Sequence, residues 1–261
     1  MYEVINKVCR KPSSGPDEMP GSLIKDIADI ISIPLSNLIN RSFLEGVYPE
    51  ALKKTKVVPI FKNKGSTEDV FQYRPISVQI QLAKVFESCF QSRLYGYLEG
   101  HNLLSTCQHG FRRERSTMSA INSLISFITT SLNKKEHPMG IFFDMSRAFD
   151  MVDHNLLCSK LERMGVRGVA NGWIRSFLSG REQMVQVNGK KSNYQRVQIG
   201  TPQGSVLSPI LFCCFINDLP ACCNAGGTTV IYADDTNFLI SEGKLNATVS
   251  RSQMAIDQIL E

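Results

Sequence analysis

Apolar positions in the first half of the chain recur with the spacing of amphipathic helices. Pro34 suits the first turn of one such helix, where its missing N–H breaks no hydrogen bond, and Gly100 can end another. The predicted helices cover residues 22–32, 34–45, 81–98 and 116–132. Between them a short strand, 56–61, leads into a loop of Lys, Gly and Ser.

The second half of the chain alternates between strand and helix patterns. Residues 140–144 (GIFFD) form a short apolar run that ends in a carboxylate, as a buried strand can. Residues 183–199 alternate around an Asn-Gly pair, which indicates a hairpin. Helices are predicted over 153–164 and after Ser208, and two β-rich runs meet at an Asp-Asp pair. This interleaving predicts an α+β fold in which helices cover one side of a sheet.

The composition is that of a folded protein, with 43% apolar and 20% charged residues in 261. That length suffices for one large domain or two small ones. The longest uncharged run, 197–217, is broken by Gly and Pro, and the N-terminus has no apolar signal core. Eight cysteines include two adjacent pairs among apolar neighbours, which favours reduced, buried thiols. We therefore expect an intracellular protein, in the nucleus, the cytoplasm or both, and not a secreted one.

The net charge of +5 includes a local cluster of lysines opposed only by Glu50. Two interpretations of this cluster stay open, a solvated surface and a phosphate-binding patch. Its members are Lys53, Lys54, Lys56, Lys62 and Lys64.

Asp234 and Asp235 stand between two strand-like runs, where a solvated turn is the simplest interpretation. However, both runs are apolar and β-branched, which places the turn at the edge of a core. Carboxylates held there need a cation, and oxygen ligands suit Mg²⁺. Asp144 repeats the pattern, although alone it could be a strand-end cap. Three carboxylates at strand ends favour a two-metal site for phosphoryl transfer.

Seven sequence blocks, two of which contain these carboxylates, follow one another in a characteristic order. The blocks are KPSSGPDEMPGSLIK (11–25), YRPISV (73–78), HGFRRERST (109–117), FFDMSRAFDMVDH (142–154), GTPQGSVLSP (200–209), FINDLP (215–220) and YADDT (232–236). Together they resemble the reverse transcriptase of non-LTR, LINE-type retrotransposons, and the jockey and CR1 branches in particular. The resemblance implies an RNA-directed DNA polymerase that extends a primer 3′-OH with two Mg²⁺ ions per site.

The resemblance also implies a role for individual residues. Asp144 and Asp234 match the metal ligands, and Asp235 matches a third carboxylate near the primer end. Phe149 matches the residue under the incoming sugar, where a ring would clash with a 2′-hydroxyl; without the motif it would be assigned to the core. The residues that match the loop touching the incoming nucleotide and the template are Gln203 and Gly204.

Basic side chains complete the expected site. Arg74 and, less closely, Lys62 match residues that hold the triphosphate, a task suited to the planar fork of arginine. The nucleic-acid contacts that the resemblance implies are Lys11, Arg112, Arg113, Arg115 and Tyr232, and a solvated surface is the alternative for the three arginines.

The implied fold is the right hand of polymerases. We expect a fingers-like, helical region over 1–138, which includes the upstream non-LTR block, and a palm over 139–261 whose small antiparallel sheet carries the aspartates. The chain ends before the helical thumb of the family, so we expect the thumb to be absent, and the full element protein would add it together with an endonuclease. The expected partners are an RNA template, a DNA primer and deoxynucleoside triphosphates, with no membrane.

Three other functions are alternatives. The chain could be a catalytically inactive, reverse-transcriptase-derived fragment of a decayed or domesticated element that at most binds nucleic acid. An RNA-dependent RNA polymerase would carry a polar residue in place of Phe149 and Gly in place of Ala233. A zinc site built from His101, Cys107 and His109, or from the paired cysteines, matches no known zinc spacing.

Overall fold

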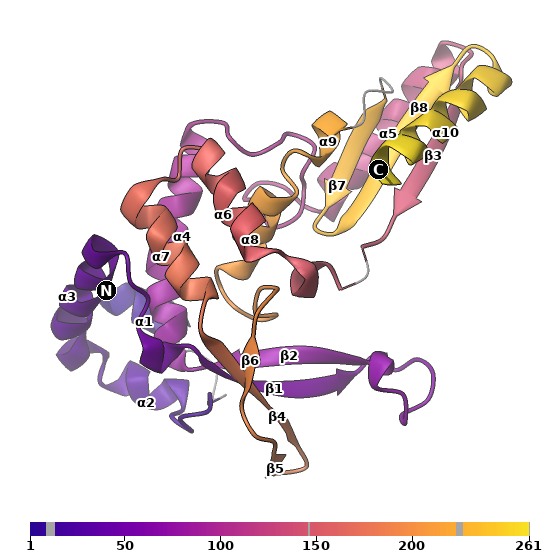
Figure 1. Ribbon diagram of the computed structural model, residues 1–261. Helices are drawn as coiled ribbons and strands as arrows, with labels where there is room; N and C mark the ends of the chain where they lie inside the picture. Colours follow the sequence, from indigo (N-terminus) through magenta and orange to yellow (C-terminus); the bar gives the residue numbers. More distant parts are fainter. Residues whose placement is uncertain (9–13, 146, 223–226, 261) are drawn as a thin grey trace. The chain divides into compact units, whose positions relative to one another are not determined.

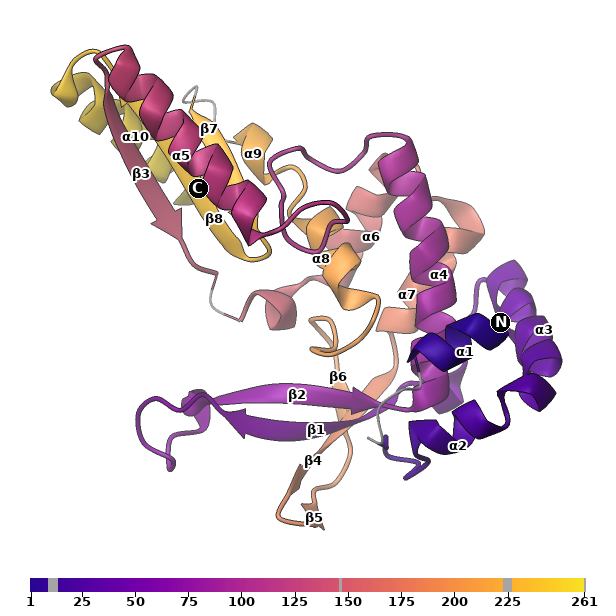
Figure 2. The same cartoon turned by 180° about the vertical axis from the view of Figure 1, so that it is seen from behind.

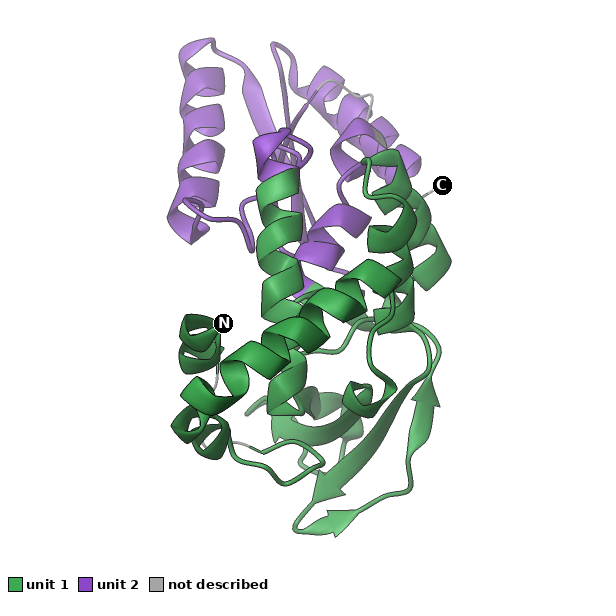
Figure 3. Cartoon of the chain, turned by 90° about the vertical axis from the view of Figure 1, so that its left-hand side faces the viewer, with its two compact units in different colours: residues 1–97, 149–208 green, residues 98–148, 209–261 purple. Residues whose placement is uncertain are grey.

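The computed structural model describes residues 1–8, 14–145, 147–222 and 227–260 (Figure 1). The chain divides into two compact units, each made of two stretches (Figure 3). Unit 1 comprises residues 1–97 and 149–208, and unit 2 comprises residues 98–148 and 209–261. The division into fingers over 1–138 and palm over 139–261 is a functional one and stays a prediction.

The helices of unit 1 pack around the single tryptophan of the chain. Trp173 is fully buried and stacks on Phe90, with the ring centroids 4.0 Å apart. Phe43 and Tyr48 meet its ring edge-on, and its indole N–H donates to Ser42 Oγ at 2.8 Å. The helices that carry these residues and their neighbours are α1 (Tyr2–Val8), α2 (Gly21–Asp26), α3 (Ala28–Glu45), α4 (Gln81–Gly100), α6 (His154–Arg163) and α7 (Gly168–Leu178). The last residues of α4 belong to unit 2.

The position of Pro34 differs from the prediction. Pro34 lies inside α3 instead of starting a helix, and the break between α2 and α3 falls at Ile27. A proline inside a helix removes one backbone hydrogen bond. Packing of Leu35 and Ile39, both buried in unit 1, outweighs that loss and keeps the helix continuous.

Unit 1 also contains a five-stranded mixed sheet, in addition to the predicted helices. Its strands are β1 (Lys54–Phe61), β2 (Tyr73–Gln79), β4 (Arg181–Val187), β5 (Lys190–Lys191) and β6 (Gln195–Val197). The strand β1 pairs antiparallel with β2 and parallel with β4, and β4 pairs with both β5 and β6. The predicted hairpin at Asn188 and Gly189 is confirmed, because both residues have the positive φ that such a two-residue turn requires.

Unit 2 is a three-stranded antiparallel sheet with helices on both faces. The strands, in the order β3-β8-β7, are β3 (His137–Phe143), β8 (Asp235–Glu242) and β7 (Thr228–Tyr232). Figures 1 and 2, seen from opposite sides, show α5 (Thr117–Asn133) on one face and α10 (Leu245–Leu260) on the other. The pattern predicted helices on one side only, and α10 covers the second. Two short helices, α8 (Ser208–Phe215) and α9 (Leu219–Cys222), precede β7.

Local signals place α5 where the sequence analysis expected it. The Ser116 hydroxyl accepts a hydrogen bond from Ser119 N–H, and the Ser119 hydroxyl accepts one from Ser116 N–H, which together form a capping box. Beneath the sheet, Ile240 of β8 packs with Ala255 of α10 and with Ile141 of β3. None of the helices in the described part of the chain is both long and apolar enough to cross a membrane.

Candidate active site

The adjacent aspartates lie at the tip of the hairpin between β7 and β8. Tyr232 pairs with Asp235 across the turn, which leaves Ala233 and Asp234 as the two turn residues. Ala233 has a φ of 57°, a conformation that a residue with a Cβ atom rarely adopts. The turn therefore needs support from its surroundings to keep this backbone shape.

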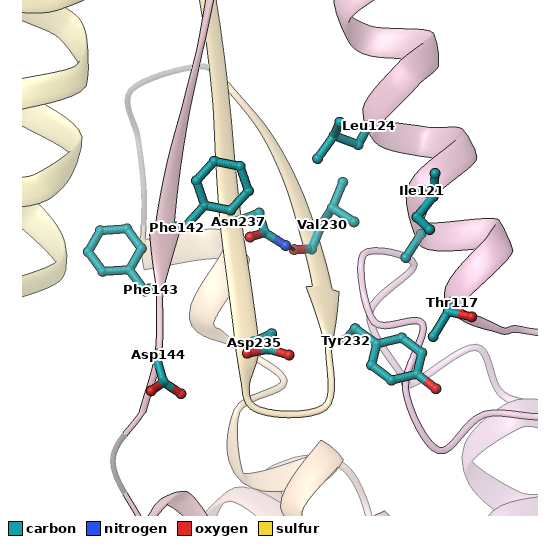
Figure 4. Close-up of a pocket in the computed structure, with 11 residues that line it drawn as sticks. Thr117, Ile121, Leu124, Phe142, Phe143, Asp144, Val230, Tyr232, Asp235 and Asn237 are labelled. Atoms are coloured by element: carbon teal, nitrogen blue, oxygen red, sulfur yellow. Dashed lines mark hydrogen bonds between the residues drawn. The ribbon is translucent and has the colours of Figure 1, made fainter. Parts of the chain in front are cut away.

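Asp144 reaches the same end of the sheet. It directly follows Phe143, which pairs with Thr236, so one further step in the register places Asp144 across from Asp235. Figure 4 shows both side chains at this end of the strands. The pKa of the Asp235 carboxyl is raised above its ordinary value, first by partial burial and then by the negative charges of Asp234 and Asp144. The three carboxylates thus influence one another electrostatically.

These carboxylates do not form a closed set of metal ligands. Among the residues that the structure describes, no three His, Cys, Asp or Glu side chains are gathered tightly enough to hold a metal ion. The zinc alternative also includes Cys223, which lies outside the described residues. The donor chemistry nevertheless fits Mg²⁺, because carboxylate oxygens are its preferred protein ligands. A cation would also reverse the repulsion that raises the pKa of Asp235. Asp144, Asp234 and Asp235 are the residues that could hold it.

A pocket of about 450 Å³ opens beside the carboxylates, between α5 and the sheet (Figure 4). Asp144 and Asp235 form part of its wall together with Tyr232 of β7. The rest is largely apolar and includes Ile121, Leu124, Phe142, Phe143 and Val230. The predicted nucleic-acid contact Tyr232 therefore lies beside the candidate catalytic residues.

In unit 1 the structure brings Phe149, Gln203 and Gly204 together. Thr201 N–H donates to Phe149 C=O at 2.8 Å, and Gln203 Nε2 donates to Asp150 Oδ1 at 2.8 Å. Gly204 has a φ of +113°, and a Cβ atom there would lie 2.7 Å from Ser77 O. Only glycine fits this position without displacing the backbone.

The same loop is held at its end by Glu87, a residue that the sequence analysis missed. Glu87 is fully buried in α4. Its carboxylate accepts hydrogen bonds from Ser205 Oγ at 2.6 Å and Val206 N at 2.9 Å, and from Gln79 Nε2 at 2.6 Å. A glutamate in an amphipathic helix is normally assigned to the solvent face. The available signal was its spacing, because Glu87 shares a helix face with the apolar residues Ala83 and Phe90.

Lys62 and Arg74 lie at one end of the β1–β2 hairpin. Lys62 directly follows Phe61, Arg74 directly follows Tyr73, and these two aromatic residues pair across the strands with their rings 5.3 Å apart. Both basic residues are exposed, and Lys62 Nζ donates to Phe71 C=O at 2.9 Å. The structure thus places both on one hairpin, and their role in triphosphate binding stays a prediction.

The other predicted nucleic-acid contacts are less uniform. Arg112 makes contacts within unit 2. It forms a bidentate ion pair with Glu99 at 2.6 and 2.8 Å and donates to Ser105 C=O at 2.7 Å. Arg115 Nη1 donates to Thr106 C=O at 2.7 Å, so both arginines brace the same loop. Arg113 is exposed, and Lys11 lies outside the described residues.

The lysine cluster is only partly a surface feature. Lys53 is buried and pairs with Glu50 at 2.5 Å. Lys54 is exposed and lies over the ring of Tyr194, with Nζ 5.1 Å from its centroid. Lys53 therefore contributes to the structure of unit 1 and is not available as a phosphate ligand.

Known proteins resemble the chain over nearly all of its length. The family model for reverse transcriptase (RNA-dependent DNA polymerase) matches residues 61–258. The RNA-directed DNA polymerase from mobile element jockey of Drosophila melanogaster is 30% identical over 97% of this chain and 28% of its own length. The probable RNA-directed DNA polymerase from transposon BS of the same species is 31% identical over 94% of this chain, and again 28% of its own length. The probable polymerase from transposon X-element is 28% identical over 84% of this chain and 24% of its own length. The chain therefore spans about a quarter of the length of these relatives.

Proposed function

Because the chain belongs to the reverse transcriptase family, with relatives among non-LTR retrotransposons, we propose that it extends a DNA primer on an RNA template with deoxynucleoside triphosphates. In this reaction the primer 3′ oxygen bonds to the α-phosphorus and pyrophosphate leaves. The fold that we propose is the polymerase right hand, with fingers over 1–138 and palm over 139–261. In the full element protein a thumb and an endonuclease would be added, and the protein would act inside the cell.

One observation carries this proposal for unit 2. The ends of β3 and the β7–β8 hairpin bring Asp144, Asp234 and Asp235 to the same end of the small sheet, where partial burial and then the charges of Asp234 and Asp144 raise the pKa of Asp235. We propose that Asp144 and Asp234 hold two Mg²⁺ ions, with Asp235 as the third carboxylate. Bound ions would activate the 3′ oxygen and neutralise charge on the leaving pyrophosphate.

The residues proposed to bind nucleotide all belong to unit 1. Phe149 would exclude a 2′-hydroxyl, and Gln203 and Gly204 would contact the nucleotide and the template. Arg74 and Lys62 would bind the triphosphate through charge-assisted hydrogen bonds. Template and primer contacts are proposed for Tyr232, Arg113 and Arg115, for Lys11, and for any part of Arg112 that its ion pair with Glu99 leaves accessible.

Replacing the metal-ligand candidates tests the proposal. Asp144→Asn or Asp234→Asn keeps the size of the side chain and removes its charge, so primer extension should fall on the order of a thousandfold or more. The assay is Mg²⁺-dependent extension of a DNA primer on an RNA template. It uses this chain and also the jockey polymerase in which this chain replaces the matching segment.

Asp257→Asn is the matched control, because Asp257 is an exposed carboxylate of unit 2 outside the candidate site. Its activity should equal that of the wild-type chain. Retention of a tenth of the activity by Asp234→Asn would contradict the assignment. Salt-dependent RNA binding without extension by either wild-type protein would favour the inactive, nucleic-acid-binding alternative.

A further inference from the structure

A loop of unit 2, residues 107–110, is hydrogen-bonded to β7 next to the aspartate turn. His109 N–H donates to Ile231 C=O at 2.7 Å, and Ile231 N–H donates to Cys107 C=O at 2.9 Å. These bonds form a short parallel bridge between the loop and β7, just before the turn. The residue between them, Gln108, belongs to none of the predicted sites.

The side chain of Gln108 holds both polar groups of the first turn residue. Its Oε1 atom accepts from Ala233 N–H at 3.0 Å, and its Nε2 atom donates to Ala233 C=O at 3.3 Å. Oε1 also accepts from Gly110 N–H at 2.7 Å. This arrangement fixes the orientation of the amide, because a flipped amide would bring its NH₂ group against two N–H donors. Only 3% of Gln108 is exposed, so water cannot replace these bonds easily.

The backbones of the loop and the turn lie in close contact at Gly110 and Ala233. A Cβ atom on Gly110 would lie 2.3 Å from Ala233 N, so glycine alone permits this approach. The loop itself is anchored on its other side, where Asn217 accepts from Ser105 N–H at 2.7 Å and donates to Leu103 C=O at 2.8 Å. Gln108 therefore connects a braced loop to a turn with strained backbone.

We propose that Gln108 is a positioning residue for Asp234 and Asp235. By binding both polar groups of Ala233 it holds the positive φ of that residue and thereby the directions in which the two following carboxylates leave the backbone. Those carboxylates repel each other, so without the amide the turn would relax away from the geometry that binds metal. The inference rests on the proposed function, since it assigns the carboxylates to Mg²⁺.

The first test separates metal affinity from the maximal rate. Gln108→Met keeps the volume of the side chain and removes all three hydrogen bonds. We expect the Mg²⁺ concentration for half-maximal primer extension to rise about tenfold or more, while saturating Mg²⁺ restores much of the rate. Gln108→Glu keeps the two acceptor contacts but places a carboxylate oxygen against Ala233 C=O. This variant should therefore also need a higher Mg²⁺ concentration for half-maximal extension. A purely structural role would lower the fraction of active protein and leave the half-maximal Mg²⁺ concentration unchanged.

The second test needs no activity. Backbone amide exchange is followed at Ala233 and Gly110 in the chain without metal, and exchange at both should quicken at least tenfold in Gln108→Met. In Gln108→Glu both amides keep an acceptor and should stay closer to the wild type. Gln253→Met is the control for both tests, because Gln253 is an exposed amide of α10 that bonds Asp257.

The outcomes are distinguishable. Unchanged amide exchange at Ala233, or an unchanged Mg²⁺ requirement in an active and folded variant, would overturn the role of Gln108. Faster exchange in a chain that extends no primer under any condition would support the role of Gln108 in holding the turn. The same result would reject the proposed polymerase function.

Discussion

Two adjacent aspartates at a hairpin tip oppose the folding of that tip. The pKa of Asp235 is raised from an ordinary value of 3.8, through partial burial and the charges of Asp234 and Asp144. An acid whose pKa is raised by folding stabilises the fold below its unfolded pKa, and this contribution is lost as the pH rises through the folded pKa. At neutral pH without metal, the ionised Asp235 therefore lowers the stability of unit 2.

Asp235→Asn should remove this pH-dependent contribution to the stability of unit 2. Without metal, the variant should be more stable than the wild type at pH 7, by less than about 1 kcal/mol because solvent screens an exposed carboxyl. The difference should shrink as the pH falls through the folded pKa of Asp235 and should be lost below the unfolded value of 3.8, where the carboxyl is protonated in both states. Urea unfolding in EDTA across this pH range measures it, and Mg²⁺ should also reduce it by stabilising the wild type. An equal difference at every pH would show that electrostatics is not the cause.

Phe149 is the residue that we propose selects deoxynucleotides over ribonucleotides. Its backbone C=O accepts from Thr201 N–H, so a change of side chain leaves this link to the Gln203 loop in place. Phe149→Val should raise ribonucleotide incorporation by about tenfold or more while deoxynucleotide use stays within about an order of magnitude, because removing a clash relaxes specificity more than catalysis. Single-nucleotide incorporation measures both.

Phe149→Tyr keeps the ring and is the matched control, which should discriminate as the wild type does. If a folded Phe149→Val chain kept full discrimination, Phe149 would be a packing residue. A melting curve establishes folding, since loss of a half-buried ring also lowers stability.

Among the elements, α4 has a second task besides packing. It presents Glu87 to the loop that contains Gln203 and Gly204, and one carboxylate oxygen receives Ser205 Oγ together with the N–H groups of Val206 and Leu207. A buried carboxylate with several donors is an effective anchor, because buried donors have few other acceptors within reach. The shape of the loop is thus set by a helix that lies far from it in the sequence.

Glu87→Gln tests this anchor. The amide offers one acceptor oxygen where the carboxylate offers two, so its NH₂ group must face donors either from the loop or from Gln79. We expect the free energy of unfolding to fall by about 1–3 kcal/mol, with faster proteolysis of the loop. Urea unfolding and limited digestion measure these effects. Glu162→Gln, at an exposed position of α6, should change neither, and a Glu87→Gln chain as stable as the wild type would exclude the anchor.

Elements with strong local signals were predictable from the sequence, and others were not. The capping serine of α5 and the Asn-Gly turn at 188–189 act through neighbouring residues, so the sequence contains the whole signal. β2 was missed because Pro75 opposes a strand, yet β2 is an edge strand, where proline is tolerated. α10 was missed because small residues, Thr248, Ser252 and Ala255, fill its buried face and leave little hydrophobic periodicity.

For the molecule as a whole, the candidate site residues near the surface were easier to predict from the sequence than the buried residues that hold them in place. Asp144, Asp234 and Asp235 follow from strand ends, and the structure brings them to one end of a sheet. Glu87 and Gln108 could not be found in this way, because their partners lie more than 100 residues away. Each unit is also assembled from two separated stretches, which no local pattern reveals.

The residues proposed for metal binding and those proposed for nucleotide binding belong to different units. The candidate metal ligands Asp144, Asp234 and Asp235 all belong to unit 2, whereas the candidate nucleotide-binding residues all belong to unit 1. Neither unit alone contains the full set of groups that primer extension needs. Polymerase activity is therefore expected only of a chain that holds both.

The bonds between Gln108 and Ala233 join residues that are 125 positions apart. During synthesis the loop at 107–110 leaves the ribosome long before the hairpin that it supports, and closing so long a stretch of chain costs entropy that only late contacts repay. The loop itself depends on Asn217 and Ile231, so the loop and the aspartate turn reach their final geometry together, near the end of this segment.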